Sequence, residues 1–429
     1  MKRYLQRFQG SAIAKNTLWM LGGNGLKLAI QAAYFILIAR SLEPAQYGAF
    51  VAVVAIAAIV SPFVGLGTSN LIIRNVARDA ASFSRSWGNG LLVTLASGEV
   101  GLVLILCCTF LLPAHLHWSV LLLVAAADLI FGRIVDFCGF VFSAVDRFGA
   151  TAQLNMWSSL SRLIGLGILV AFVHRPSIEA WAATYLAATF ATAAGALGWG
   201  LTTLEKPTLQ TREIWPELKE GVFFSVGLSA QTIYNDIDKT MLAKLGDLSA
   251  TGIYGAAYRI IDVSLVPLRS ILSAANPGFF RAGHLGGIRE TRRYMSRLLP
   301  KTIAYAALAS IGLLVLAPIV PHILGREYVR SVSALRWLAV LPLLKTVHSF
   351  FADALTGAGH QRLRTMIQIA VAVFNILINL WIIPAYSWLG AAWSSIASDA
   401  ALLCLLGIAI AGLSRRQQEV KAMMEEAVP

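Results

Sequence analysis

Charged side chains interrupt a long apolar tract at residues 235–259, which read NDIDKTMLAKLGDLSATGIYGAAYR. Asp236, Asp238 and Lys239 stand in a run that is otherwise typical of a membrane-spanning helix, and a polar turn and an aromatic stretch follow. A charge in the hydrocarbon region of a bilayer costs several kcal/mol unless it faces water or a partner. The stretch therefore predicts two helices joined by a turn, whose charges pair with one another or bind a ligand.

The composition of the whole chain extends this interpretation. The chain has 429 residues, of which 57% are hydrophobic and 13% are charged. Because a bilayer core of about 30 Å needs about 20 apolar residues per helix, the sequence predicts an all-α polytopic membrane protein. We expect about twelve transmembrane helices in two six-helix lobes around a central cleft. The predicted spans lie near residues 17–39, 46–67, 87–112, 118–142, 150–173, 178–201, 220–245, 250–277, 299–324, 332–357, 364–384 and 388–412.

Lys and Arg fall mainly in the loops on one side of these spans, and basic loops resist translocation. We therefore expect both termini in the cytoplasm, and we interpret the net charge of +13 as a topology signal with attraction to membrane lipids rather than to nucleic acid. The predicted parts are a cytoplasmic N-terminus (1–16), an N-lobe (17–201), a cytoplasmic linker (202–219), a C-lobe (220–413) and a cytoplasmic tail (414–429).

A short motif recurs after the first predicted helix of each half. Tyr47-Gly48 and Tyr254-Gly255 occupy similar sites, and basic turns near 146–147 and 360–364 form a second match. Parallel repeats of this kind place a substrate site between the two halves. The matches favour duplication over chance.

Charges at predicted membrane depth divide into those with a local partner and those without. Spacing of three residues predicts pairs on one helix face: Arg133 with Asp136, Asp236 with Lys239, and Arg259 with Asp262. Structural ion pairing explains these as well as ligand binding does. Lys27, Arg162, Arg269 and Lys345 have no such neighbour, so each must reach another helix, water or a ligand.

Three predicted helices carry a polar stripe at steps of three and four residues, which marks one helix face. The stripes consist of Asn24, Lys27, Gln31 and Tyr34; of Ser225, Ser229, Thr232, Asp236 and Lys239; and of Tyr254, Tyr258, Asp262, Arg269, Ser273 and Asn276. Interhelical hydrogen bonding alone explains one stripe, whereas three favour a water-filled cleft.

Several chemistries have no signature in the sequence. The chain has no Gly-x-x-x-x-Gly-Lys-Ser/Thr loop for phosphate binding, no His-Glu-x-x-His pattern and no nucleophile motif. We therefore expect no enzyme activity, no cofactor and no bound metal.

Three motifs give the chain a resemblance to a known family. They are ARSLEPAQYG at 39–48, DKTMLAKLG at 238–246 with GIYGAAYR at 252–259, and NLWIIP at 379–384 with LGAA at 389–392. The chain resembles the polysaccharide and O-antigen flippases of the multidrug/oligosaccharidyl-lipid/polysaccharide exporter superfamily. The resemblance implies two six-helix lobes that open alternately to each side of the membrane.

This resemblance predicts translocation of an undecaprenyl-diphosphate-linked oligosaccharide from the inner to the outer leaflet of the bacterial cytoplasmic membrane. Drug exporters of the superfamily commonly carry an acid in the first helix, where this chain has Lys27. The predicted substrate-binding residues are Lys27, Arg259, Arg269, Lys239, Arg162, Asn24, Gln31, Tyr34, Tyr258, Asp236 and Asp262. Tyr34, Tyr254 and Tyr258 are candidates for stacking on sugar rings.

The sequence does not decide whether the protein has further partners. The candidates are a polysaccharide polymerase, glycosyltransferases, and H+ or Na+ as a coupling ion. One alternative function is a multidrug antiporter of the same superfamily, motivated by the lone acids Glu99, Asp128 and Asp399. A second alternative is a non-transporting membrane scaffold for glycan assembly.

Overall fold

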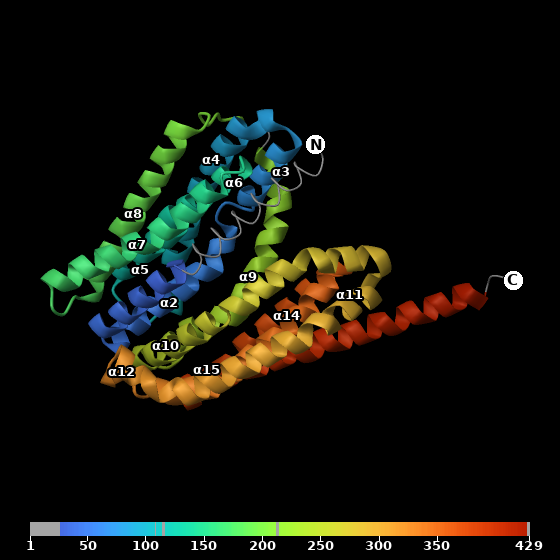
Figure 1. Ribbon diagram of the computed structural model, residues 1–429. Helices are drawn as coiled ribbons and strands as arrows, with labels where there is room; N and C mark the ends of the chain where they lie inside the picture. Colours follow the sequence, from blue (N-terminus) through green and yellow to red (C-terminus); the bar gives the residue numbers. More distant parts are fainter. Residues whose placement is uncertain (1–25, 108, 114–115, 212–213, 427–429) are drawn as a thin grey trace, which may run out of the picture. The chain divides into compact units, whose positions relative to one another are not determined.

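The computed structural model describes residues 26–426 except 108, 114–115 and 212–213 (Figure 1). Every regular element within these ranges is a helix, which confirms the predicted all-α class. The chain forms two compact units, Met1–Ser229 and Ala230–Pro429. The predicted linker at 202–219 lies shortly before this division, which falls inside a helix.

The first unit begins its described part with a helix over residues 26–41. Its further elements are α2 (Pro44–Val60), η1 (Ser61–Phe63), α3 (Thr68–Arg78), η2 (Ala80–Ser82), α4 (Phe83–Cys107), η3 (Thr109–Leu111), α5 (Trp118–Ala126), a π-helical turn (Ala127–Gly132), α6 (Arg133–Ala144), α7 (Phe148–Phe172) and α8 (Ile178–Thr203). Helices α7 and α8 lie side by side as an antiparallel pair (Figure 1). Helix α9 (Ile214–Leu245) starts in this unit and ends in the next.

The second unit is built from longer helices. They are α10 (Leu248–Ser264), α11 (Val266–Leu316), η6 (Ala317–Ile319), α12 (Val320–Leu324), η7 (Arg326–Tyr328), α13 (Ser331–Leu338), α14 (Leu341–Gly357) and α15 (Gln361–Glu426). Helix α14 packs against both α11 and α15. Helices α11 and α15 each change direction once, because the backbone is non-helical at Gly286 and Gly287 and at Ser387.

Seven helical segments in the described part are long and apolar enough to cross a bilayer. Two of them contain 59 residues each, which would extend about 89 Å if unbroken, or about three bilayer cores. Their breaks divide each into two lengths, and each length has at least the number of residues that one crossing needs. The predicted span at 118–142 is helical but is divided by the π-helical turn. The predicted span at 17–39 is described only from residue 26.

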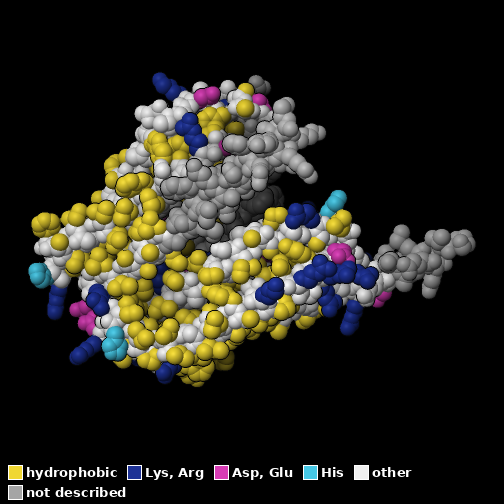
Figure 2. Space-filling view, in the orientation of Figure 1, with side chains coloured by type: hydrophobic (Ala, Val, Ile, Leu, Met, Phe, Trp, Pro, Cys, Tyr) yellow, Lys and Arg dark blue, Asp and Glu magenta, His cyan; other side chains and the backbone are white. Residues whose placement is uncertain are grey.

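The surface of the long helices suits a hydrocarbon environment. Phe172, Leu308, Trp381 and Ile408 are each at least 69% exposed, and Figure 2 shows hydrophobic side chains over much of the visible described surface. Lys and Arg gather instead near the Gly286–Gly287 turn, where exposed basic side chains follow one another along the chain. Apolar sides and basic ends are the pattern that a polytopic membrane protein requires.

Part of the predicted linker is hydrogen-bonded to the N-terminal part of α4. The side-chain amide of Asn89 donates to the Gln210 carbonyl oxygen at 3.0 Å and accepts from the Gln210 N–H at 2.9 Å. The Thr208 N–H donates to the Ser84 carbonyl oxygen at 2.9 Å. This close approach requires a glycine, because a Cβ atom on Gly88 would lie 2.2 Å from the Thr208 carbonyl oxygen.

Replacing Gly88 with alanine tests this attachment. Gly88→Ala forces the Thr208 backbone away from α4, and we expect a loss of about 1–3 kcal/mol of stability from overpacking, measured by thermal unfolding of the purified protein. Gly167→Ala is the matched control, because no atom lies within 4 Å of its added Cβ. Equal melting temperatures for the two variants would contradict the close packing described.

Candidate functional site

A charged cluster occupies the interior of the first unit. The Arg162 guanidinium on α7 lies 4.5 Å from the ring centre of Tyr185 and donates from Nε to the Thr189 hydroxyl at 3.3 Å. One of its terminal nitrogens lies 3.9 Å from an Asp128 carboxylate oxygen, to which the Tyr185 hydroxyl donates at 2.6 Å. Arg162 therefore finds its partners on other helices, as its sequence context predicts.

The position of Asp128 depends on an irregular helix. Asp128 lies in the π-helical turn Ala127–Gly132, which adds a residue per turn and changes the direction of the side chains that follow. Helix α4 packs closely on this turn, because a Cβ atom on Gly98 would lie 2.7 Å from the Leu129 carbonyl oxygen. The turn and the glycine together place the carboxylate opposite Arg162.

Lys27 is the other cation of interest in this unit. It is half-buried, and its ammonium group donates to the Asn155 side-chain oxygen at 3.2 Å. It makes no ion pair with any carboxylate among the described residues. Gln31 and Tyr34 of the same predicted stripe are also half-buried, whereas Asn24 lies outside the described residues. Among the described residues, the ammonium group of Lys27 therefore has a neutral hydrogen-bond partner and a more distant electrostatic attraction from Asp136.

A buried carboxylate joins three helices of the second unit. Asp238 on α9 is fully buried and accepts hydrogen bonds from the hydroxyls of Tyr254 on α10 and of Ser395 on α15, the latter at 2.8 Å. A carboxylate satisfied by two hydroxyls is stable away from water. The motif that begins at Asp238 is therefore explained by packing.

Lys239 follows Asp238 directly and is equally buried. Its ammonium group forms an ion pair with Asp236, donates to the Asn235 carbonyl oxygen at 3.1 Å, and lies 4.1 Å from the ring centre of Tyr258. This confirms the predicted pairing of Asp236 with Lys239. Tyr258 is 4% exposed, so its ring offers no open face to a sugar in this conformation, and its stacking role stays a prediction.

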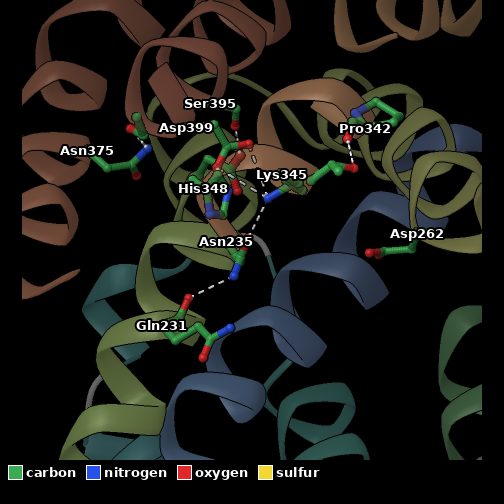
Figure 3. Close-up of polar contacts among 12 residues, drawn as sticks. Gln231, Asn235, Asp262, Pro342, Lys345, His348, Asn375, Ser395 and Asp399 are labelled. Atoms are coloured by element: carbon green, nitrogen blue, oxygen red, sulfur yellow. Dashed lines mark hydrogen bonds and ion pairs between the residues drawn. The ribbon is translucent and has the colours of Figure 1, made fainter. Parts of the chain in front are cut away.

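A second buried network shares Asn235 with Lys239, and Figure 3 shows its members Asn235, Lys345, His348 and Asp399. Lys345 on α14 forms an ion pair with Asp399 on α15 at 3.2 Å, and it donates to the Asn235 side-chain oxygen at 2.7 Å. His348, one helical turn after Lys345, places its Nε2 atom 3.3 Å from the other Asp399 oxygen. Asp399 therefore has two basic partners, which favours a structural role over the binding of a free cation.

The pairing predicted between Arg259 and Asp262 is wrong. Asp262, near the end of α10, instead accepts from Arg269 on α11 at 2.9 Å, a residue that the sequence leaves without a partner. The chain passes from α10 to α11 at Leu265, between the two residues. Arg259 is exposed and makes no ion pair among the described residues. The predicted pair of Arg133 and Asp136 is confirmed at 3.2 Å.

Several residues of these clusters are not among the substrate-binding residues that the sequence predicts. Asn235, His348 and Ser395 complete the networks of the second unit, and Asp128 and Tyr185 complete that of the first. Spacing gives some signal, since Lys345 with His348 and Ser395 with Asp399 each share a helix face. Spacing along the chain does not predict partners that lie on different helices.

Three of the five cations predicted to bind substrate face a carboxylate. They are Arg162, Lys239 and Arg269, and Lys345 faces one as well. Lys27 and Arg259 form no ion pair within the part of the chain that the structure describes. Among the predicted substrate-binding cations, these two are therefore the most available to an anionic ligand.

The Lys345–Asp399 pair can be tested by removing one partner. Asp399→Asn leaves a buried ammonium group without its carboxylate, and we expect a loss of about 3–5 kcal/mol of stability. The double variant Lys345→Met with Asp399→Leu should recover most of it, because buried apolar pairs replace such ion pairs well. Thermal and chemical unfolding of the purified variants give both values.

The exposed pair of Arg293 with Glu290, whose charged atoms are 3.9 Å apart, supplies the control. Glu290→Gln should cost less than about 1 kcal/mol, as exposed pairs do. A similar small loss for Asp399→Asn would show that the buried network does not stabilise the second unit.

Two solved structures have a fold similar to that of this chain. An inward-facing multidrug resistance transporter of the MATE family, in the MOP superfamily, superposes with a TM-score of 0.74 at 15% identity, over 90% of this chain and 96% of that chain. The lipid II flippase MurJ in its inward closed conformation gives 0.72 at 11% identity, over 92% and 87%. At these identities the likeness shows the fold alone, and this fold agrees with the predicted all-α membrane architecture.

Sequence comparison gives the family. A probable low-salt glycan biosynthesis flippase of Haloferax volcanii, Agl15, is 24% identical over 254 residues, which are 57% of this chain and 52% of the relative. The match thus spans about half the length of this curated relative. The family model described as polysaccharide biosynthesis protein matches residues 13–282, which is more than half of the chain. The chain belongs to the polysaccharide biosynthesis protein family.

Proposed function

We propose that this protein is a flippase that moves an undecaprenyl-diphosphate-linked oligosaccharide from the inner to the outer leaflet of a bacterial cytoplasmic membrane by alternating access. The observation that carries the proposal is Lys27, a half-buried cation whose hydrogen-bond partner among the described residues is the neutral Asn155 amide. Family membership supports it, and so does the flippase named among the relatives. The proposed orientation has both termini in the cytoplasm.

The chemistry of a diphosphate suits a cation of this kind. An ammonium group that is already paired with a carboxylate must lose that partner before it binds phosphate. Lys27 has to exchange only a neutral amide for a charged acceptor, and hydrogen bonds between charged groups are about twice as strong as neutral ones. Lys27 is therefore the proposed contact for the diphosphate in the first unit.

Arg259 is the corresponding candidate in the second unit. Its guanidinium is exposed and has no ion pair among the described residues. Arg269, Lys239 and Arg162 are proposed to take part only if their own carboxylates release them. The membrane potential helps an anion outward by about 2.3 kcal/mol per charge per 100 mV, so a coupling ion would serve to reset the empty carrier.

Substitution of Lys27 tests the main contact. We expect Lys27→Met to lower flipping of a fluorescent undecaprenyl-diphosphate oligosaccharide in proteoliposomes by about tenfold or more, since loss of a charged hydrogen bond costs about 1.5–3 kcal/mol. Lys27→Arg should retain much of the rate because it keeps the charge.

Arg175→Gln is a charge-matched control, because Arg175 is exposed in the connection between α7 and α8. Its rate should equal that of the unchanged protein. Normal flipping by Lys27→Met, with Arg175→Gln also normal, would remove Lys27 from the site.

Arg259 and Arg269 should differ in their effect. Arg259→Gln removes an uncompensated cation, so we expect a larger decrease in flipping than for Arg269→Gln, which removes half of an exposed ion pair of small net energy. The same proteoliposome assay measures both. A larger loss for Arg269→Gln would mean that the Asp262 pair opens during transport and that its arginine binds the substrate.

A multidrug antiporter remains the rival function, and it predicts a different phenotype. Two of the acids that motivate it, Asp128 and Asp399, are engaged by basic partners, which leaves little negative charge for a cationic drug. A deletion strain separates the functions. Loss of surface glycan with accumulation of the lipid-linked intermediate supports the flippase, whereas changed drug tolerance with normal glycan supports the antiporter.

A further inference from the structure

A groove of about 510 Å³ opens on the second unit. It is lined by Ser333, Arg336 and Trp337 of α13, by Val340 just after this helix, and by Ile396 of α15. Trp337 is 49% exposed and Val340 is 37% exposed. The groove therefore has an open wall that combines one cation with apolar side chains.

The cation in this groove is not neutralised. Arg336 is exposed and forms no ion pair or hydrogen bond among the described residues. A guanidinium group binds phosphate with two parallel hydrogen bonds, and it does so better than an ammonium group. The groove thus offers a site for a phosphate group.

Three aromatic rings extend from the groove along the same surface. The rings of Trp337 and Trp393 are in edge contact with centres 5.9 Å apart, and the ring of Tyr386 lies 5.1 Å from that of Trp393. Trp and Tyr are enriched where lipid headgroups meet the hydrocarbon core, because each ring has an apolar body and a polar edge. The row marks the level of a membrane interface.

Along both helices, the charged or aromatic residue comes before the apolar residue of the groove. Arg336 comes about 8 Å after the start of α13 at Ser331, and Trp393 comes about 9 Å after the break at Ser387, at 1.5 Å per residue. Val340 and Ile396 each lie about 13 Å from the same starting points. The cation and aromatic rings are therefore nearest the membrane surface, and the apolar lining is deeper.

We propose that this groove binds a phospholipid. The lipid phosphate accepts hydrogen bonds from Arg336, the headgroup lies against Trp337 and Trp393, and an acyl chain runs along Val340 and Ile396. The break at Ser387 is at the opposite end of its helix from the C-terminal tail, so in the orientation proposed above the lipid belongs to the outer leaflet. The charge calls for an anion, and the apolar lining calls for an attached hydrocarbon.

Native mass spectrometry of the full chain with added phosphatidylglycerol tests this proposal. We expect Arg336→Gln to weaken binding of the most tightly retained phosphatidylglycerol by roughly tenfold, through loss of the paired charged hydrogen bonds. Arg336→Lys should weaken it less. Melting temperatures measured without added lipid should match the unchanged protein, because Arg336 forms no hydrogen bond or ion pair among the described residues that the change would break.

Arg330→Gln is the matched control, since Arg330 is exposed and lies in the connection just before α13. Unchanged retention by Arg336→Gln, or an equal loss in Arg330→Gln, would overturn the proposal. Displacement of phosphatidylglycerol by equimolar undecaprenyl diphosphate would assign the groove to the transported lipid instead and would likewise overturn it. None of these measurements depends on transport, so their failure is separate from that of the proposed flippase function.

Discussion

The structure depends on the high cost of an unpartnered charge inside a bilayer. In each unit, contacts between charged residues on different helices offset this cost. Arg162 on α7 reaches Asp128 in the π-helical turn, and Lys345 on α14 reaches Asp399 on α15. Since such a partner cannot be withdrawn without exposing a charge to hydrocarbon, the contacts fix which helix faces meet. The polar networks therefore determine helix packing as much as the apolar side chains around them.

The polar stripes that look alike in the sequence acquire different roles once the chain is folded. Tyr254 and Tyr258 are buried and bound to neighbours within the second unit, whereas Arg269, further along the same stripe, is exposed beside Asp262. One stripe thus contains a packed half and an open half. Only the open half can meet a ligand without rearrangement.

Local spacing explains what the sequence predicts well and where it fails. The helices follow from apolar length, and three-residue spacing correctly predicts the Arg133 and Lys239 pairs. The same rule fails for Asp262, because the chain passes from α10 to α11 at Leu265 and brings Arg269 to this carboxylate. The partnership of Asn235 and His348 with Lys345 and Asp399 joins three helices, and no spacing along one helix encodes it.

Burial and neutralisation act in opposite directions on an anion site. A buried cation attracts phosphate strongly because water does not screen it, yet burial normally forces the cation to take a carboxylate partner, as Lys345 does. Lys27 avoids this outcome, because it is only half-buried and an amide satisfies it. It thus keeps its charge available in partial shelter from solvent. A carrier that must bind a lipid diphosphate and then release it needs this intermediate condition, since a fully buried cation would hold the anion too firmly and a fully exposed one would hold it too weakly.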